Sequence, residues 1–419
     1  MNNSRLFKKT LLAVTIATTS IASQQAMAAG FQLNAQSATG IGRAFAGDAV
    51  IADNASVMAR NPAAMALFDK MELSLGFETI ITDIEVKDAE YKSAAGTTAA
   101  SNYDNAGATS VAPNIHLIVP VNDQFAWGAN AYSNFGTRTD FGSDFVGAEY
   151  GGETEIMSIN FGLAGSYRLN EQWSFGAGLD LIYGQGTLKR NVSDSFYKGP
   201  TNNPLGAFLA SKNGAEILNI DQADGWGVGF NVGTVFELNE NNRFGLSYRY
   251  SPDITAKDGS QEITLPLPDM AEFSGYHKIE DTKFAVHYSI QYIGWGDFDK
   301  IEFKNAGITE KEYGWQDGWH YAIGGTYYLN NDWTLRAGYM YDTSAQDEIT
   351  SISVPDSDRQ WFSTGFTYHL DSSSNVDFGF TYLVGEDVKV SEANAGVSSI
   401  TGTTRANAIL VGLQYSRSF

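Results

Sequence analysis

The residues that most often carry enzyme chemistry form no recognisable motif in this chain. None of its five histidines takes part in the H-E-x-x-H pattern that would place two imidazoles on a zinc ion. The G-x-S-x-G turn of a nucleophilic serine is absent. Gly40-Ile41-Gly42 follows no predicted strand and lacks the third glycine of a dinucleotide-binding loop. We therefore predict no catalytic residue, no metal site and no cofactor, and we expect a protein that is not an enzyme.

Charge and cysteine content narrow the class of protein further. The chain carries 27 basic and 48 acidic residues, a formal net charge of −21. Binding to nucleic acid requires Lys and Arg that neutralise phosphates, so we expect no nucleic acid partner. The sequence contains no cysteine, and its stability therefore cannot depend on disulfide bonds.

The first 28 residues have the pattern of a secretory signal peptide. Basic residues precede the apolar run 11–22, and Ala26-Met27-Ala28 forms an A-x-A cleavage site. The apolar run is shorter than the roughly 20 residues that a membrane-spanning helix requires. We therefore expect cleavage before Ala29 and export of the mature chain.

From Glu72 onward, apolar and polar residues alternate. Between Met157 and Leu169 the odd positions are mostly apolar, and smaller or polar residues stand between them. A period of two predicts strands with two different faces. A soluble sandwich also alternates, but its strands are typically about 5–6 residues long, whereas tilted membrane strands need about 9–11. Because these segments are long and end in aromatic residues, as in the girdles of membrane barrels, we predict a transmembrane β-barrel.

Fourteen such segments can be counted, an even number as in bacterial single-chain barrels. The connections after even-numbered segments are short and rich in Asn, Asp and Ser, which form tight turns. The other connections are longer, the longest spanning 191–223. Since periplasmic turns are short and extracellular loops long, we expect both chain ends on the periplasmic side. The predicted strands are 70–84, 110–121, 124–139, 155–170, 172–190, 224–239, 242–254, 264–279, 282–298, 315–330, 332–343, 358–371, 375–388 and 407–419.

The segment 29–69 differs from everything that follows it. It is rich in Ala, Gly and Asn and shows no sustained alternation. The turn pattern places it at the periplasmic mouth of the barrel, and its polar residues suit a polar lumen. We therefore predict a cleaved signal peptide (1–28), an N-terminal hatch inside the lumen (29–69) and an all-β, 14-stranded antiparallel transmembrane barrel (70–419) with long extracellular loops.

The hatch sequence, which runs from AGFQLNAQSATGIGRAFAGDAV to ARNPAAM, closely resembles the mature N-terminus of FadL-type long-chain fatty acid transporters. Shorter resemblances at 122–128, 325–328 and 352–356 extend over the mature chain. The resemblance implies an outer-membrane barrel of fourteen strands with an N-terminal hatch. It also implies that a hydrophobic ligand is caught between outer loops, released by a change in the hatch and passed sideways through a gap in the wall.

The resemblance assigns a gating role to the hatch motif Asn61, Pro62 and Ala63, where proline would form a rigid corner. It also implies a kink in the third strand at the lateral exit. Glycine inside a strand commonly marks a bend, although the same stretch also fits an ordinary strand end. The kink residues would be Ser133, Asn134, Phe135 and Gly136.

Arg190 stands where the resemblance implies a basic residue for a ligand carboxylate, which an arginine can hold through two hydrogen bonds. A surface cation is the alternative reading of Arg190. The second basic position of the family falls at Gln316, which leaves room for a neutral or aromatic ligand. Apolar patches in two long connections are further candidates for ligand contact, with loop packing as the alternative. These residues are Leu205, Phe208 and Leu209 in the first patch and Leu265 and Leu267 in the second.

These features predict an outer-membrane transporter of long-chain fatty acids, or similar hydrophobic molecules, that works by passive, hatch-gated diffusion with lateral exit. A general aqueous porin and an aromatic hydrocarbon channel are the alternatives. The expected partners are the hydrophobic ligand, outer-membrane lipid and lipopolysaccharide, and the barrel assembly machinery, for which the terminal Phe419 is a suitable signal. We expect a monomer in the outer membrane of a Gram-negative bacterium.

Overall fold

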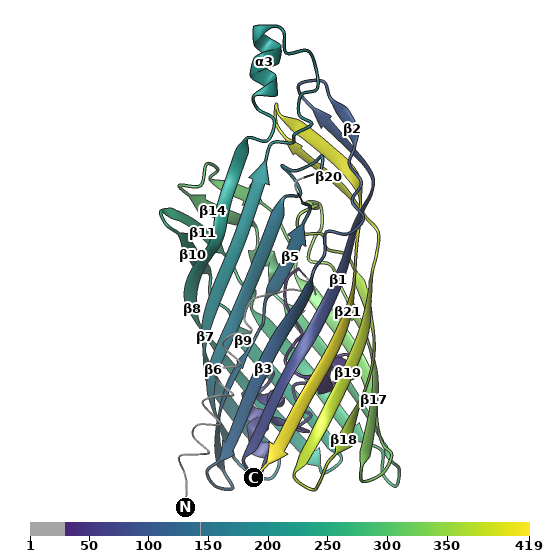
Figure 1. Ribbon diagram of the computed structural model, residues 1–419. Helices are drawn as coiled ribbons and strands as arrows, with labels where there is room; N and C mark the ends of the chain where they lie inside the picture. The colour runs from purple at the N-terminus through teal and green to yellow at the C-terminus, as the bar shows by residue number, and fades with distance from the viewer. Residues whose placement is uncertain (1–29, 143) are drawn as a thin grey trace, which may run out of the picture.

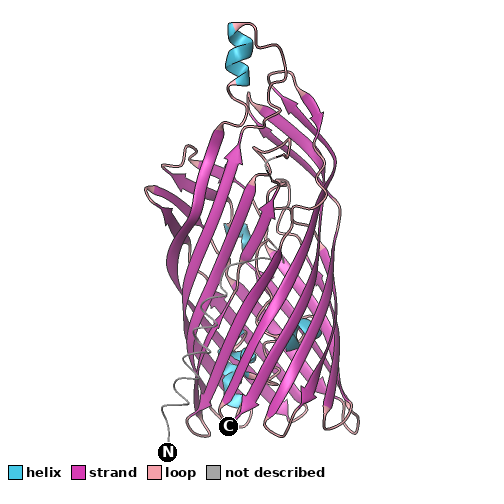
Figure 2. Cartoon of the chain, viewed as in Figure 1, coloured by secondary structure: helices cyan, strands magenta, loops and turns pink. Residues whose placement is uncertain are grey.

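The computed structural model describes residues 30–142 and 144–419, so the predicted signal peptide lies outside the described residues. Within them, antiparallel strands form one tall closed barrel (Figure 1). The barrel closes because the first strand, β1 (Glu72–Ser93), pairs with the last, β21 (Ser398–Ser418). Strands dominate and the helices are short (Figure 2). No helix in the described part of the chain is long and apolar enough to cross a membrane.

The described wall has fourteen strand positions, and each overlaps one predicted strand, so the predicted fold class is confirmed. The third position is divided between two strands, β4 and β5. In chain order the wall consists of β1, β3 (Thr109–Pro120), β4 (Phe125–Tyr132) with β5 (Gly136–Asp140), β6 (Glu153–Arg168), β7 (Trp173–Asn191), β8 (Glu216–Asn239), β9 (Asn242–Tyr250), β12 (Met270–Lys278), β13 (Phe284–Ile293), β16 (Gly318–Tyr328), β17 (Trp333–Asp342), β18 (Arg359–His369), β19 (Ser374–Gly385) and β21.

Short and long connections alternate as predicted. At the end of the barrel that holds the C-terminus, called the turn end below, tight turns join the strands (Figure 1). Asn170 shows how these turns form, since its side-chain oxygen accepts hydrogen bonds from the backbone N–H groups of Gln172 and Trp173, both at 2.9 Å. Asn122 and Asn330 make equivalent bonds. Asn therefore closes these turns with its own side chain.

The opposite end, called the loop end, carries the long connections and their additional elements. Several wall strands extend into it, and β8 begins at Glu216 rather than at residue 224 because it continues to pair with β7. The predicted strand 264–279 was wrong as one element. It is divided between β11 and β12 at Pro266 and Pro268, which cannot donate ladder hydrogen bonds. The elements of the loop end are β2 (Thr98–Ala100), α3 (Pro204–Ala210), β10 (Ile254–Asp258), β11 (Gln261–Leu265), η3 (Trp295–Asp297), β14 (Lys300–Lys304), β15 (Glu310–Glu312) and β20 (Val388–Asn394).

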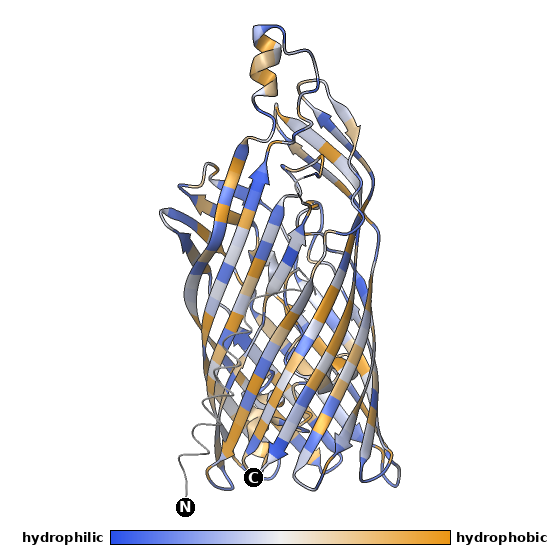
Figure 3. Cartoon of the chain, viewed as in Figure 1, coloured by the Kyte–Doolittle hydropathy of each residue, from blue (hydrophilic) through white to orange (hydrophobic). Residues whose placement is uncertain are grey.

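The wall strands point their apolar residues outward. In β6, Phe161 and Leu163 are 44% and 60% exposed, whereas Asn160 and Ser166, at even-numbered positions of the same strand, are buried inside the barrel. Figure 3 shows the same alternation of apolar and polar residues along other strands. An apolar outside with a polar inside is the arrangement of a membrane barrel, and it is the inverse of a soluble sandwich.

Candidate functional site

The described residues before β1, 30–71, enter the barrel, and residues 30–50 are all buried there. Their three short helices, α2 (Ala38–Gly42), η1 (Ala55–Ala59) and η2 (Pro62–Leu67), contact different parts of the wall. The helix α2 packs on β18, β19 and β21, η1 packs on β3, and η2 packs on β6, β7 and β8. We call residues 30–68 the hatch, and it contacts strands around the circumference of the lumen.

Glycines in the wall let the hatch backbone lie directly against the strands. A Cβ added at Gly176 would come within 2.3 Å of the backbone nitrogen of Ala63. At Gly379 it would come within 2.2 Å of the carbonyl oxygen of Ala38. Glycine within a strand allows this close approach of another backbone. The position of the hatch therefore depends on the absence of side chains at these wall positions.

Asn61 joins the hatch to itself and to the wall. Its side-chain oxygen caps η2 by accepting a hydrogen bond from Ala63 N at 3.0 Å. Its amide nitrogen donates to the carbonyl oxygens of Ala49, at 2.8 Å, and of Thr234 in β8, at 3.0 Å. Pro62 occupies the first position of η2, where its missing N–H is not needed. The motif predicted from sequence is therefore a helix start anchored to the barrel.

Ion pairs also hold the hatch in the polar lumen. Arg43 contacts Asp48 at 2.7 Å and Asp53 at 2.8 Å, and Arg336 of β17 reaches Asp53 at 3.2 Å. Burial alone would raise the pKa of Asp53, but Arg43 and Arg336 outweigh it and hold the pKa below its ordinary value. Because the hatch and the wall share these charges, separating them would leave buried ions unpaired, at a cost of several kcal/mol.

The wall is interrupted in its third strand position. Ser133 and Asn134 belong to no strand, and Phe135 forms an isolated bridge with Gln32 of the hatch before β5 begins at Gly136. Gly136 therefore stands at the start of a strand. The predicted kink thus coincides with a break between β4 and β5.

We call residues 30–33, at the start of the hatch, the hatch arm. Residues 31–33 of this arm lie across the break and hydrogen-bond to its backbone. Leu33 N donates to the carbonyl oxygen of Asn134 at 2.6 Å, and Gly136 N donates to that of Phe31 at 2.8 Å. The hatch arm therefore supplies the strand contacts that the wall lacks at this point.

An apolar pocket, partly open to solvent, adjoins the break, and we call it the apolar cavity. Phe135 lines it from the break, and Ile156 of β6 lines it from the wall. Leu265 and Leu267, two of the predicted ligand contacts, also line it. Its lining is mostly apolar with few polar groups, as is usual for a site that binds a hydrophobic small molecule.

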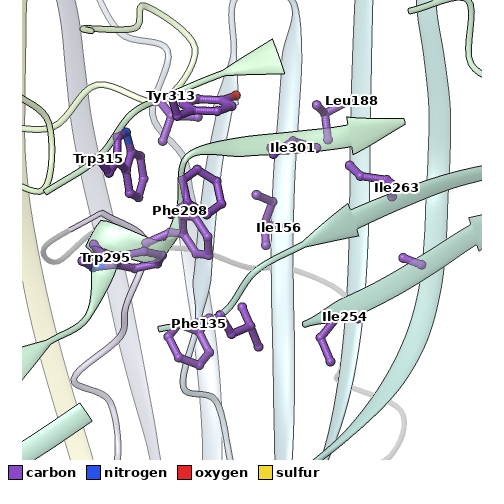
Figure 4. Packing of buried hydrophobic residues seen from close by; sticks show 14 of the residues in the cluster. Phe135, Ile156, Leu188, Ile254, Ile263, Trp295, Phe298, Ile301, Tyr313 and Trp315 are labelled. Atoms are coloured by element: carbon purple, nitrogen blue, oxygen red, sulfur yellow. The ribbon is translucent and has the colours of Figure 1, made fainter. Parts of the chain in front are cut away.

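Phe31 of the hatch sits among aromatic rings next to this cavity. Its ring centroid lies 4.5 Å from that of Trp295, 5.4 Å from Phe298 and 5.7 Å from Trp315. It also lies 6.3 Å from the ring of Phe135 at the break. Figure 4 shows the four ring partners, Phe135, Trp295, Phe298 and Trp315, beside aliphatic residues of the cluster. Phe31 thus occupies an aromatic pocket that an apolar ligand could also fill.

The start of the hatch is held by a buried carboxylate. Asp356, in the connection between β17 and β18, accepts hydrogen bonds from Gly30 N at 3.3 Å and Ala345 N at 2.7 Å. Arg359 donates to it at 2.5 Å and lies 3.3 Å from Asp342. Burial raises the pKa of the Asp356 carboxyl, with Arg359 opposing the shift. The arm is therefore tethered on both sides of Phe31.

The predicted ligand residues divide into two groups. Leu265 and Leu267 lie at the cavity. The guanidinium of Arg190 instead donates to the carbonyl oxygens of Glu153 and Lys189, at 2.7 and 2.8 Å, and to Thr154 Oγ1 at 2.6 Å. Gln316 is exposed, and its side-chain amide nitrogen lies 3.3 Å from the carbonyl oxygen of Ser344. Leu205, Phe208 and Leu209 lie on α3 at the tip of the loop end, where the first two are 66% and 57% exposed (Figure 1).

Sequence reasoning missed the aromatic pocket. It placed Trp295, Phe298 and Trp315 in predicted strands, whereas the structure places them in the connection between β13 and β16. The available signal was that Trp295 and Trp315 each directly follow a glycine, Gly294 and Gly314. Within the described residues, no group of three or more His, Cys, Asp and Glu side chains is arranged to hold a metal ion.

A closed barrel with an apolar exterior, an internal hatch and an apolar cavity beside a wall break defines a membrane channel for apolar molecules. Comparison with known proteins agrees. Residues 19–419 match the family described as outer membrane protein transport protein (OMPP1/FadL/TodX), and the chain belongs to this family of outer-membrane β-barrel proteins. Its members are transport proteins rather than enzymes.

Individual relatives are similar over most of their length. The long-chain fatty acid transport protein of Salmonella typhi is 37% identical over 94% of this chain and 95% of its own. The crystal structure of a Pseudomonas aeruginosa FadL homologue covers 93% of this chain and 100% of its own, with 22% identity and a TM-score of 0.82. The Pseudomonas putida toluene transporter TodX covers the same shares with 20% identity and a TM-score of 0.64.

Proposed function

We propose that this protein takes up long-chain fatty acids, or similar hydrophobic molecules, across the outer membrane by passive diffusion. The ligand enters from the loop end, occupies the apolar cavity and the aromatic pocket, and leaves sideways through the break between β4 and β5. The hatch is the gate. The fatty acid assignment is supported by the relative from Salmonella typhi, and the observation that carries the gate is the hatch arm hydrogen-bonded across the wall break.

The physical reason for a lateral exit is the cost of wetting an alkyl chain. Each buried CH₂ group contributes about 0.8 kcal/mol relative to water. Inside the lumen the hatch carries buried ion pairs, such as those of Arg43 with Asp48 and Asp53, so a route along the barrel axis would bring the alkyl chain against charged groups. The break instead opens the apolar cavity toward the lipid-facing wall, so the chain of the ligand can stay out of water.

Arg190 is not required as a free ligand cation in this proposal. Its guanidinium donates three hydrogen bonds to backbone and hydroxyl oxygens of the wall. The apolar contacts of Leu265, Leu267 and the aromatic pocket are the main source of affinity. The exposed apolar side chains on α3 offer a first contact at the loop end.

A disulfide lock tests the gate. Gln32 and Phe135 are direct partners in an antiparallel bridge, and the adjacent residues make the hydrogen bonds, so this pair is of the closely spaced type, with Cα atoms about 4.5 Å apart. That spacing suits a disulfide, and the chain has no other cysteine. In the double variant Gln32→Cys with Phe135→Cys, oxidation should abolish the uptake of labelled oleate by cells, and reduction should restore it.

A wall pair serves as the matched control. Thr79 and Val111 face each other in β1 and β3, so Thr79→Cys with Val111→Cys joins two strands without touching the hatch. Oxidation of this pair should leave uptake unchanged. The gate would be refuted if the oxidised hatch lock transported oleate as fast as its reduced form. The fatty acid assignment would fail if the wild-type protein gave no uptake above that of cells lacking it.

Aromatic hydrocarbons are the second candidate class of ligand. The observation in favour is the pocket of Trp295, Phe298 and Trp315, whose occupant Phe31 is itself an aromatic ring. The similar fold of the toluene transporter supports the same candidate. Measuring oleate uptake in the presence of excess toluene tests this candidate. Slower uptake of oleate indicates that both classes of ligand use the pocket, and unchanged uptake decides against aromatic hydrocarbons.

A further inference from the structure

One ring nitrogen of His320 lies between the hatch and the wall. His320 stands near the start of β16, and its Nδ1 is 3.3 Å from the side-chain nitrogen of Asn34 in the hatch. The same Nδ1 is 2.9 Å from the side-chain oxygen of Gln291 in β13. His320, Asn34 and Gln291 are 2%, 2% and 5% exposed, so both contacts are made in the interior of the protein.

The two amide side chains offer opposite partners to this nitrogen. The oxygen of Asn34 accepts hydrogen bonds from the side chains of Gln32, at 3.1 Å, and of Arg60, so its nitrogen is the group that faces the ring. Gln291 presents its oxygen. An amide nitrogen donates and an amide oxygen accepts. A bare Nδ1 can therefore bind only Asn34, and a protonated Nδ1 can bind only Gln291.

The other ring nitrogen is held by a carboxylate. Nε2 of His320 lies 3.2 Å from Oδ1 of Asp342 in β17. Because a carboxylate accepts hydrogen bonds, it keeps a hydrogen on Nε2 in both charge states of the ring, and the second proton must go to Nδ1. Protonation of His320 thus ends the hydrogen bond from Asn34 and sets two N–H groups against each other, while it creates a hydrogen bond to Gln291.

The charges around His320 can accommodate an imidazolium. Asp342 also lies 3.3 Å from Arg359, which in turn donates to Asp356 at 2.5 Å. On the hatch side, the arginine that binds Asn34 lies 3.3 Å from a glutamate of β12. The charged groups that face this site are Asp342 of β17, Asp356 of the connection 343–358, Arg359 of β18, Arg60 of the hatch and Glu272 of β12. Among these, three carboxylates stand against two guanidinium groups, so a proton on His320 creates no excess of positive charge.

His116 shows why contact with the hatch is not sufficient for such a switch. Its Nε2 lies 3.0 Å from the carbonyl oxygen of Gln36. A carbonyl oxygen only accepts, and a protonated ring still donates to it. Protonation of His116 therefore keeps its hatch contact, whereas protonation of His320 removes one.

We propose that His320 is a pH-sensitive positioning residue of the gate: its neutral ring holds the hatch through Asn34, and its imidazolium releases Asn34 and binds Gln291 instead. Asn34 directly follows the hatch arm, and Leu33 beside it hydrogen-bonds to the wall break. Because the docked hatch requires the neutral ring, this contribution to docking is present at high pH and lost as the pH falls. Acid therefore loosens the arm. This inference rests on the proposed function and adds regulation by pH to it.

Hydrogen–deuterium exchange of the purified full-length barrel tests the switch without transport. The variant His320→Asn places an oxygen where Nδ1 stands, so it can accept from Asn34 but does not titrate. Exchange of peptides that cover the hatch arm is measured at pH 8 and pH 5.5, and the wild-type rate is divided by the variant rate, which cancels the intrinsic effect of pH on exchange. This ratio should rise roughly fivefold at pH 5.5, the effect of one neutral hydrogen bond. His116→Gln is the matched control, and it should show the same rise as the wild type.

Asn34→Asp supplies a readout that a merely structural role of His320 would not move. An aspartate accepts the N–H of the imidazolium, so acid should now tighten the arm. The rate of Asn34→Asp, divided by that of the double variant Asn34→Asp with His320→Asn, should therefore fall at pH 5.5. If His320→Asn alone does not give a heat-modifiable barrel, the direction of the pH response in Asn34→Asp, compared with the wild type, decides.

Oleate uptake at the same two pH values connects the switch to transport. The ratio of wild-type to His320→Asn uptake should rise at pH 5.5, and the ionisation of oleate cancels in this ratio. Exchange ratios that do not change with pH, or a response of the same sign in Asn34→Asp, overturn the switch. A response in exchange without one in uptake overturns the regulation of the gate. Absence of wild-type uptake with an intact exchange response refutes the proposed function and not the switch.

Discussion

Asn61 offers a sharp test of how the hatch is held. Asn61→Ala removes the cap of η2, worth about 1 kcal/mol, and the hydrogen bonds to Ala49 and Thr234, worth about 1 kcal/mol each. The free energy of opening this part of the hatch should therefore fall by about 3 kcal/mol. Since about 1.4 kcal/mol is tenfold in an equilibrium constant, the open population should rise roughly 100-fold.

Hydrogen–deuterium exchange of peptides that cover the hatch motif and η2 measures this change, because exchange follows the open population when reclosing is fast. The matched control is Asn122→Ala. The side chain of Asn122 also accepts two backbone hydrogen bonds, from Gln124 and Phe125, but in a turn outside the lumen. It should leave hatch exchange unchanged. If Asn61→Ala accelerated exchange less than about threefold, the hatch would be held by its other contacts, and the reasoning from Asn61 would be wrong.

Three further predictions use the same barrel. Phe31→Ala should destabilise the docked hatch arm by about 3 kcal/mol or more and expose the amides of Leu33 and Gly136 to hydrogen exchange. Retained protection of these amides would show that the aromatic pocket does not hold the arm. Gly176→Val should displace η2 and make the hatch sensitive to added protease. Gly165→Val is the control and should not, because a Cβ added there lies 3.9 Å from its nearest neighbouring atom. Equal sensitivity of the two variants would contradict the close approach at Gly176. Arg190→Met should lower the thermal midpoint of the barrel but change oleate uptake less than about twofold, since the guanidinium bonds to the wall; a tenfold loss of uptake would make Arg190 a ligand contact.

The strand count and the order of short and long connections could be predicted from sequence. Both depend on local physics. The period of two between Met157 and Leu169 reflects which face of one strand meets lipid, and an asparagine such as Asn170 closes its turn with bonds to residues two and three positions ahead. The hatch was recognisable as a segment without alternation, and the resemblance identified its motif.

The exact ends of the strands were less predictable. The run that was predicted as 264–279 alternates well enough, yet Pro266 and Pro268 divide it in the structure. The run that was predicted as 282–298 ends at Ile293, after which the chain turns inward and places Trp295 in the aromatic pocket. A pattern of apolar residues cannot distinguish a strand that faces lipid from a connection that packs on the hatch, because both bury apolar surface away from water.

The sequence by itself thus determined a membrane barrel of fourteen strands with an internal hatch. Only the tertiary structure decided what the stretch from Ser133 to Gly136 does, since it fits a kink and a strand end equally well until the hatch arm is seen bonded across it. The aromatic pocket around Phe31 likewise appears only in the folded chain. The ring partners of Phe31 lie about one hundred residues or more away along the chain, and contacts at such separations leave no periodic signal in a sequence.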